Sequence, residues 1–230
     1  MEIKDKVVVI TGASRGLGKS LAECFAREGS KVAVSARSKD ELEKLGRKIN
    51  ATYITADVTK EQDIINLADS VVKQFGRIDI WVNNAGTWIP PAPAEELDTK
   101  KTHEMIEVNL FGTIYGSKAA LTQMRKQDSG TIVNIISTSA LEGRPNSSGY
   151  CASKFAADGF CKSMRRETES SNINVINIYP GGIKTHLFDE YKAARYSDYM
   201  EPETVAEKII DNLKQEKPEE DLIIRRPSQR

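Results

Sequence analysis

Residues 6–18 read Lys6-Val-Val-Val-Ile-Thr-Gly-Ala-Ser-Arg-Gly-Leu-Gly18, and this stretch indicates an α/β fold. The run Val7–Ile10 is continuously apolar, which is typical of a strand covered on both faces. A glycine-rich turn follows, and after it an apolar helical pattern at Leu21, Ala22, Phe25 and Ala26. Such a turn lets backbone N–H groups approach a phosphate at the N-terminus of the helix. The stretch therefore predicts a strand, a phosphate-binding turn and a helix.

The turn fits two phosphate-binding motifs that imply different functions. Its three glycines have the spacing G-x-x-x-G-x-G, which suits a dinucleotide and leaves Lys19 as a solvated helix residue. The segment also comes close to a P-loop, with Ala13 in the place of the first glycine. Lys19 and Ser20 would then bind phosphates and magnesium, as in a nucleotide kinase or NTPase. The turn alone leaves both interpretations open.

Strand and helix patterns alternate along the rest of the chain. Short apolar runs predict further strands at residues 31–35, 52–55, 78–82, 131–136, 173–178 and 222–224. Amphipathic runs predict helices at residues 40–49, 62–75, 102–127, 147–169 and 203–214. The alternation predicts a doubly wound α/β fold, with a seven-stranded parallel sheet and helices on both faces. No linker or repeat divides the sequence, so we predict one domain over residues 1–230, with a short lid at about residues 183–200.

Small or polar residues follow six of the predicted strands. Ligands of such sheets bind at the C-terminal ends of the strands, where these residues would form one rim. The small or polar residues that follow these strands are Gly12–Gly18, Arg37, Asp57, Asn83–Gly86, Ser137 and Pro180–Thr185. A rim of this kind is more specific than any single motif.

Tyr150 and Lys154 are four residues apart on a predicted helix, so their side chains share a face. An ammonium group near a phenol lowers the phenol pKa, and a tyrosine shifted towards neutrality can act as a general acid or base. Ser137, at the preceding strand end, can hydrogen-bond a substrate oxygen. Ser139 is a rival for this role, but Ser137 directly follows the apolar run. Taken alone, a Tyr-x-x-x-Lys spacing of this kind is more often a pair on the protein surface, so the rest of the chain has to decide.

Together these motifs resemble the short-chain dehydrogenase/reductase family over nearly the whole chain. The matching residues are the glycine turn, Asn83-Asn-Ala-Gly86, Asn109, Ser137, Tyr150, Lys154, Pro180-Gly181 and Thr185. The resemblance implies an enzyme that transfers a hydride between a nicotinamide cofactor and a carbonyl or alcohol substrate. It also makes the P-loop interpretation much less favourable, because a kinase has no reason to carry the later motifs.

The resemblance implies a role for each catalytic residue. Tyr150 is expected to exchange the proton, and Lys154 to lower the pKa of Tyr150 and bond the nicotinamide ribose. Ser137 would hold the substrate oxygen, and Asn109 would kink the long helix and hold a water. The expected cofactor-binding residues are Gly12, Ser14, Arg15, Gly16, Leu17, Gly18, Arg37, Asp57, Val58, Asn84, Ala85, Gly86, Tyr150, Lys154, Pro180, Gly181, Ile183 and Thr185.

The end of the second strand bears on the choice of cofactor. A Rossmann-type site selects NAD with an acid on the ribose 2′-OH, and NADP with a basic residue at the 2′-phosphate. Ala36 stands where NAD-preferring relatives carry the acid, and Arg37 follows it. Arg37 and Arg15 could both reach the phosphate, and an arginine fork suits that group. We therefore expect NADP(H) to be preferred over NAD(H); two solvated arginines are the simpler alternative.

Substrate contacts are expected from the loops after the fourth, fifth and sixth strands. The candidates are Trp88, Ile89, Leu141, Glu142, Arg144 and residues 183–199, which include Phe188, Tyr191, Tyr196 and Tyr199. Arg144 could meet an anionic substrate or could simply be solvated. The sequence does not name the substrate.

The charge balance and residue composition argue against several classes of partner and site. The 33 Lys and Arg residues balance the 33 Asp and Glu residues, which argues against nucleic acid or a membrane surface as a partner. No apolar run approaches the roughly 20 residues of a membrane span. His103 and His186 are isolated and the three cysteines have no metal-ligand spacing, so we expect no metal site. The odd cysteine count, and an N-terminus that opens directly into a strand pattern, lead us to expect a cytoplasmic protein.

The resemblance also implies a homo-oligomer. A homodimer through the helices at 102–127 and 147–169 is expected. A tetramer is in doubt, because the sequence after Leu222 lacks the glycine-rich segment with which many relatives end. A dinucleotide-binding sensor or scaffold without turnover is the alternative function, although Tyr150 and Lys154 are both present.

Overall fold

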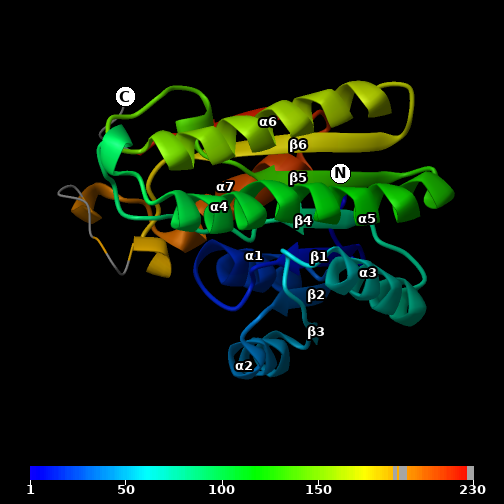
Figure 1. The fold of residues 1–230 in the computed structure, drawn as a ribbon. Coiled ribbons are helices and arrows are strands. Elements are labelled where there is room, and N and C mark those ends of the chain that lie inside the picture. Colours follow the sequence, from blue (N-terminus) through cyan, green and yellow to red (C-terminus); the bar gives the residue numbers. More distant parts are fainter. Residues whose placement is uncertain (189–190, 192–195, 227–230) are drawn as a thin grey trace.

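Seven parallel strands form one sheet in this computed structural model, which describes residues 1–188, 191 and 196–226. The strand order is β3-β2-β1-β4-β5-β6-β7 (Figure 1). The strands are β1 Val7–Thr11, β2 Lys31–Ala36, β3 Thr52–Thr55, β4 Ile80–Asn83, β5 Gly130–Ile135, β6 Ile173–Pro180 and β7 Asp221–Ile224. The order reverses direction at β1, so the sheet is doubly wound and the predicted fold class is confirmed.

Helices cover both faces of the sheet. They are α1 Gly16–Arg27, α2 Lys39–Ile49, α3 Glu61–Phe75, α4 Thr99–Ile106, α5 Gly112–Gln127, α6 Ser148–Thr168 and α7 Pro202–Lys214. Val8 and Ile10 of β1 pack with residues of α1, α2 and α7, whereas Val7 and Val9 pack with α3 and α5. This alternation follows from the two-residue period of a strand, and it explains why β1 is apolar at every position.

The predicted helix at residues 102–127 is two helices in the structure. α4 ends at Ile106, a π-helical segment η2 spans Glu107–Phe111, and α5 starts at Gly112. Within η2 the backbone carbonyl of Asn109 accepts a hydrogen bond from Thr113 Oγ1 at 2.9 Å. The predicted strand at 78–82 also moves, because β4 begins at Ile80 and includes Asn83. Short 3₁₀ turns lie at η1 Ala94–Glu96, η3 Thr138–Ala140, η4 His186–Phe188 and η5 Tyr196–Asp198.

A row of buried asparagines crosses the centre of the sheet. Asn83, Asn134 and Asn177 are register partners on β4, β5 and β6. Asn83 Nδ2 donates to Asn134 Oδ1 at 2.9 Å, and Asn134 Nδ2 donates to Asn177 Oδ1 at 3.0 Å. We call these three residues the asparagine row. Buried amides of this kind are stable only when they are hydrogen-bonded, so the row links the alignment of three strands.

Further polar groups complete both ends of the asparagine row. At the β4 end, Trp81 Nε1 donates to Asn83 Oδ1 at 2.8 Å, and Asn83 Nδ2 also donates to Ser117 Oγ at 2.9 Å. At the β6 end, Asn177 Nδ2 lies 3.4 Å from the Tyr179 hydroxyl, which donates to Asp158 Oδ1 at 2.6 Å. The network therefore runs from α5 to α6 through the middle of the sheet.

Two findings on the described residues bear on partners. Across residues 1–188, 191 and 196–226, no helix is long and apolar enough to cross a membrane. Over the same ranges, His, Cys, Asp and Glu side chains form no group that could hold a metal ion.

Candidate active site

The glycine turn after β1 packs directly on the loop after β4. Gly12 and Gly16 have φ of 65° and 56°, a conformation that side chains rarely adopt. A Cβ at Gly12 would lie 2.7 Å from Ala85 Cα, so the two backbones approach too closely for any side chain. α1 begins at Gly16 without a side-chain cap, which leaves its first N–H groups available to a ligand. This geometry fits the diphosphate of a dinucleotide.

Thr11 and Asn84 clamp the turn and the β4 loop together. Thr11 Oγ1 accepts hydrogen bonds from the backbone N–H groups of Asn84 and Ala85 at 3.1 and 3.2 Å. Asn84 Nδ2 in return donates to the carbonyls of Thr11 and Gly12 at 2.9 and 3.1 Å. These hydrogen bonds therefore fix the glycine turn against the loop after β4. We call these two segments, Gly12–Gly18 and Asn84–Gly86, the cradle.

The P-loop interpretation fails on the direction of Ser20. Ser20 is buried, and its Oγ donates to Glu203 Oε1 on α7 at 3.2 Å. The hydroxyl therefore faces the helix layer, whereas a P-loop hydroxyl must face the metal and phosphates. Lys19 is exposed, as expected for a solvated helix residue.

Arg37 follows β2 and Asp57 follows β3, on the side of β1 opposite the β4 loop. Asp57 Oδ1 accepts from the Thr59 backbone N–H at 3.0 Å and from Thr59 Oγ1 at 2.8 Å. Partial burial opposes ionisation of Asp57, but these hydrogen bonds and the nearby charge of Arg37 hold its pKa below the ordinary value. Arg37 is exposed, as is Arg15 in the glycine turn. Both guanidinium groups are accessible to an anion.

Asn109 joins the β4 loop to α6. Its Nδ2 donates to the Thr87 carbonyl at 2.9 Å and to Ser153 Oγ at 3.0 Å, while its Oδ1 accepts from the Thr87 N–H at 2.8 Å. Ser153 Oγ in turn donates to the Tyr150 carbonyl at 2.8 Å. The side chain of Asn109 thus holds the backbone next to Gly86 in place. Sequence reasoning missed Ser153, whose only signal is its position within the buried face of α6.

Lys154 is buried beside the predicted proton donor. Its Nζ lies 5.9 Å from the centroid of the Tyr150 ring and donates to the Ile135 carbonyl at 3.3 Å. A Cβ at Gly86 would lie 3.8 Å from this Nζ, so Lys154 also borders the β4 loop. Burial lowers the pKa of Lys154 to about 8.

The Tyr150 phenol lies close enough to the Ser137 side chain for Ser137 to lower the phenol pKa. Burial raises the pKa of Tyr150 to about 12, against lowering effects of the Ser137 side chain and the Arg144 charge. Desolvation outweighs both lowering effects, and the lowering of this pKa by Lys154 stays a prediction. The phenol is therefore a protonated donor at neutral pH.

The structure brings Ser137 rather than Ser139 to the phenol. Ser137 Oγ accepts from the Ser139 backbone N–H at 3.1 Å and so caps the η3 turn. Ser139 is buried, and it contributes its backbone to this cap. The η3 turn thus aims the Ser137 hydroxyl at Tyr150.

The chain after β6 returns to the glycine turn. Gly181 N donates to the Ile224 carbonyl at 2.9 Å, which fixes Pro180 and Gly181 to the end of β7. A Cβ at Gly16 would lie 3.1 Å from Thr185 Cγ2, so Thr185 lies against the cradle. Ile183 is buried and bridges to Met200. Of the predicted lid, residues 189–190 and 192–195 lie outside the described residues.

The remaining predicted cofactor residues lie around the same rim. Ser14 is half-buried in the turn, and Leu17 is buried in the core side of α1, so Leu17 can offer only its backbone. Val58 packs against Gly112, where a Cβ would lie 3.0 Å from Val58 Cγ2. The predicted site residues therefore lie at the C-terminal ends of the strands, in the loops that follow them or on the adjoining helices, where Gly16, Leu17, Gly18, Asn109, Tyr150 and Lys154 are found.

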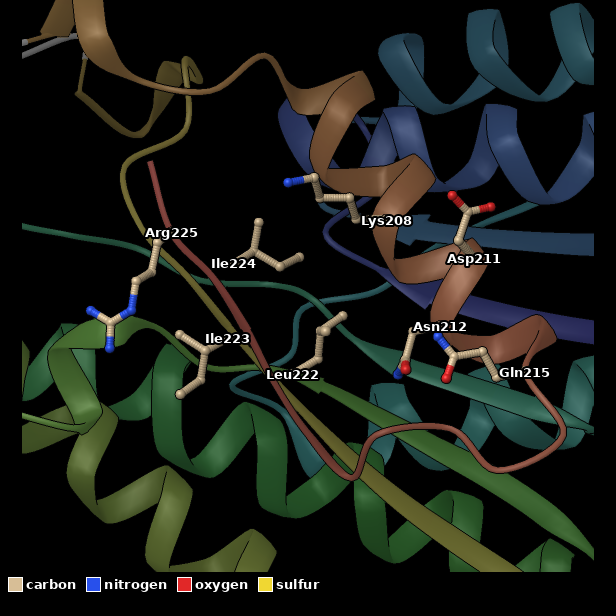
Figure 2. Close-up of a pocket in the computed structure, with 8 residues that line it drawn as sticks. All are labelled: Lys208, Asp211, Asn212, Gln215, Leu222, Ile223, Ile224 and Arg225. Carbon is tan, nitrogen blue, oxygen red and sulfur yellow. The ribbon is translucent and has the colours of Figure 1, made fainter. Parts of the chain in front are cut away.

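A pocket lies beside β7, the last strand of the sheet. It has a volume of about 260 Å³ and lies between α7 and β7, as Figure 2 shows. Its lining residues are Lys208, Asp211, Asn212, Gln215, Leu222, Ile223, Ile224 and Arg225, and none is a predicted site residue.

Comparison with known proteins decides the family. A family model described as short chain dehydrogenase matches residues 6–195. The chain belongs to the short-chain dehydrogenase family. An uncharacterized oxidoreductase of Staphylococcus saprophyticus is 35% identical and aligns over 99% of this chain and 98% of its own length. The Bacillus subtilis oxidoreductase YxnA is 33% identical over 97% of this chain and 66% of its own length.

Solved structures of this dehydrogenase family superimpose closely. An alcohol dehydrogenase from Thermococcus sibiricus complexed with 5-hydroxy-NADP has a TM-score of 0.90 at 31% identity, covering 98% of both chains. A 3-ketoacyl-(acyl-carrier-protein) reductase from Brucella melitensis complexed with NADH has a TM-score of 0.90 at 26% identity, covering 97% of this chain and 98% of that one. The protein is therefore an oxidoreductase of the short-chain dehydrogenase family.

Proposed function

We propose that the protein is an NADP(H)-dependent oxidoreductase that acts on carbonyl and alcohol groups, with Tyr150 as general acid and base. The observation that carries this proposal is the approach of Ser137 and the buried Lys154 ammonium to the Tyr150 side chain. This cluster lies at the C-terminal edge of the sheet, next to the glycine turn. Hydride transfer to a carbonyl carbon needs a proton donor at the carbonyl oxygen, and the phenol is placed to supply it.

Each side chain has a separate part in the reaction. The bound dinucleotide supplies or accepts the hydride. Ser137 and Tyr150 hold the substrate oxygen, and Tyr150 gives its proton to that oxygen during reduction. Lys154, with a pKa of about 8, holds a proton that can replace the one lost by Tyr150. Asn109 and Ser153 position this group by tying α6 to the β4 loop.

The preference for NADP(H) over NAD(H) is part of the proposal. Ala36 provides no carboxylate for a ribose 2′-OH, and the exposed Arg15 and Arg37 flank the place where a 2′-phosphate would lie. The diphosphate would lie against Gly12, Ser14, Gly16, Leu17 and Gly18, and the adenine near Asp57 and Val58. The nicotinamide end would lie against Asn84, Ala85, Gly86, Tyr150, Lys154, Pro180, Gly181, Ile183 and Thr185.

We also propose a homodimer formed through α5 and α6. Phe111 and Phe155 are large apolar side chains with 36% and 45% of their surface exposed, and they lie on η2 and α6. Phe111 also stacks near Tyr115 of α5, with ring centroids 6.0 Å apart. Burial of these rings would favour association. Light scattering that gives a monomer at micromolar concentration would contradict this part.

A cytoplasmic location and a small-molecule substrate complete the proposal. Cys24, Cys151 and Cys161 are free and buried, which suits a reducing compartment. The balanced charge of the chain gives no support for nucleic acid or a membrane as a partner.

The test follows absorbance at 340 nm with NADPH and NADH against ketones, aldehydes, quinones and β-ketoesters. We expect wild type to oxidise NADPH and Tyr150→Phe to lose that activity while still binding the cofactor. A Tyr150→Phe variant as active as wild type would overturn the assignment of the donor. Tight NADPH binding without turnover of any compound would favour the sensor or scaffold instead.

A further inference from the structure

We propose that Arg144 binds a carboxylate of the substrate, so that the substrate is an oxo acid and the product the matching hydroxy acid. This inference rests on the proposed oxidoreductase function and names the substrate class of that same site. It is carried by the position of Arg144, by the lack of a counter-ion for it among the described residues and by the apolar side chains of the neighbouring loops.

Arg144 lies in the loop that connects η3 to α6. Its Nη2 donates to Thr138 Oγ1 at 2.9 Å, and Thr138 directly follows Ser137. This hydrogen bond folds the loop back over the turn that carries the Ser137 hydroxyl. The guanidinium is then close enough to the Tyr150 phenol for its charge to lower the phenol pKa. Arg144 therefore shares the substrate side of the site with both Ser137 and Tyr150.

The guanidinium of Arg144 is half-buried and poorly satisfied. Arginine has five N–H donors, and in this structure Thr138 takes one of those of Arg144. Nε is buried and has no hydrogen-bond partner. Among residues 1–188, 191 and 196–226, no carboxylate forms an ion pair with Arg144. Burying an unpaired charged donor is costly, so a site that retains one is suited to an anionic ligand.

Arg165 shows how this chain satisfies an arginine that has only a structural role. Arg165 lies on α6, and its side chain is 16% exposed. It pairs with Asp221 through two hydrogen bonds of 2.8 and 3.1 Å and also donates to the backbone carbonyls of Val175 and Glu220. Arg144 has no such set of acceptors. The planar fork of a guanidinium matches a carboxylate with two parallel hydrogen bonds, so a carboxylate is the expected acceptor.

Apolar and aromatic side chains of the loops that follow β4, β5 and β6 offer surface to the rest of a small substrate. Trp88, from the β4 loop, lies with its ring centroid 6.3 Å from that of Tyr191, from the segment after β6. Leu141, in the same loop as Arg144, is exposed. Tyr199 packs on Gly182, and its phenol is near enough to raise the pKa of Tyr150. A short hydrocarbon chain between the carboxylate and the carbonyl suits these surfaces.

The chemistry remains that of the proposed function. The reduced dinucleotide gives a hydride to the carbonyl carbon, and Tyr150 gives a proton to the carbonyl oxygen. The carbon–oxygen double bond becomes a single bond and the dinucleotide is oxidised. The carboxylate is unchanged, because it serves only to orient the substrate on Arg144.

The test compares charged and neutral forms of the same substrates. Pyruvate, acetoacetate and 4-oxopentanoate would each be assayed beside the methyl ester, with NADPH, in wild type and Arg144→Met. Methionine keeps an unbranched side chain that replaces the aliphatic part of arginine, but it removes the charge and all five donors. Any effect of the substitution on Tyr150 acts on acid and ester alike, so it cancels in the acid-to-ester ratio of kcat/KM. We expect Arg144→Met to lower this ratio by about 10- to 100-fold, mainly through KM of the acid.

Two further variants sharpen the result. Arg144→Lys retains the charge and is expected to recover part of the ratio. Arg166→Met removes an exposed arginine near the other end of α6, which pairs only with Glu169, and is expected to leave the ratio as in wild type. An unchanged ratio in Arg144→Met would overturn the inference.

Failure of the inference is distinguishable from failure of the proposed function. If wild type reduces neutral 2,3-butanedione in a Tyr150-dependent manner but turns over none of the three acids, the oxo acid assignment is wrong and the oxidoreductase proposal stands. If none of the tested carbonyl compounds, charged or neutral, supports oxidation of NADPH by wild type, both proposals are overturned.

Discussion

Removing the central amide of the asparagine row should destabilise the fold by an amount that the hydrogen bonds define. In Asn134→Leu, a side chain of similar size replaces the amide, so packing changes little. Asn177 Oδ1 loses its partner at 3.0 Å, and one of the two hydrogens of Asn83 Nδ2 loses its acceptor at 2.9 Å. Each unsatisfied buried group costs about 1–3 kcal/mol, so the free energy of unfolding should fall by about 2–6 kcal/mol.

A double-mutant cycle makes this prediction specific. Asn177→Leu removes the acceptor that Asn134→Leu leaves unsatisfied, so the double variant should lose less than the sum of the single losses. Asn177→Leu alone also leaves the Asn134 Nδ2 donor unsatisfied, and the double variant removes both groups, so the difference should be about 2–6 kcal/mol. Urea denaturation at one protein concentration gives each free energy of unfolding.

The matched control is Asn174→Leu on the same strand. Asn174 is exposed on β6, and its substitution should change stability by no more than about 0.5 kcal/mol. A loss in Asn134→Leu no larger than that of the control would refute the reasoning, and so would additive losses in the double variant.

Three other predictions concern the site. Lys154 has a folded-state pKa of about 8 against an ordinary 10.5, so the folded state binds fewer protons than the unfolded state between these pH values, and wild-type stability should rise across them. Lys154→Met removes the buried charge and should be more stable than wild type by up to about 3 kcal/mol below pH 8. The difference should fade by pH 10.5, as measured by urea denaturation at each pH. Arg37→Ala should reduce the NADPH-to-NADH ratio of kcat/KM by about 10- to 100-fold, and an unchanged ratio would remove Arg37 from the 2′-phosphate site. Gly12→Ala should lose NADPH binding and at least about 1–3 kcal/mol of stability, because its Cβ would lie 2.7 Å from Ala85 Cα. The control Gly159→Ala has open space around its Cβ and should be neutral or stabilising.

The sheet could be predicted because its signals are local. The apolar run at Val7–Ile10 and the glycine turn after it are legible without any knowledge of distant contacts. The same holds for the clustering of small and polar residues at strand ends, because a parallel sheet brings its C-terminal ends to one edge. Strand and helix limits were less well predicted, as the shift of β4 shows.

Features that depend on distant contacts were not predictable. The π-helical segment around Asn109 adjoins hydrogen bonds to Thr87 and Ser153, which lie far along the chain. The spacing of Tyr150 and Lys154 indicated a shared helix face, but spacing carries no information on burial, which dominates both pKa values. The approach of Arg144 to the phenol depends on a loop that folds back onto Thr138.

Backbone hydrogen bonds of Gly182, Lys184 and Met200 join the two ends of the segment between β6 and α7, and they affect how freely that segment can change. Gly182 O accepts from Met200 N at 3.0 Å, Met200 O accepts from Lys184 N at 2.9 Å, and Lys184 pairs with Glu201. These contacts close the two ends of the intervening segment independently of what lies between them. Because loop closure costs little more as a loop lengthens, insertions and replacements here would leave β6 and α7 undisturbed. The segment between Lys184 and Met200 can therefore change in length or sequence without disturbing the sheet.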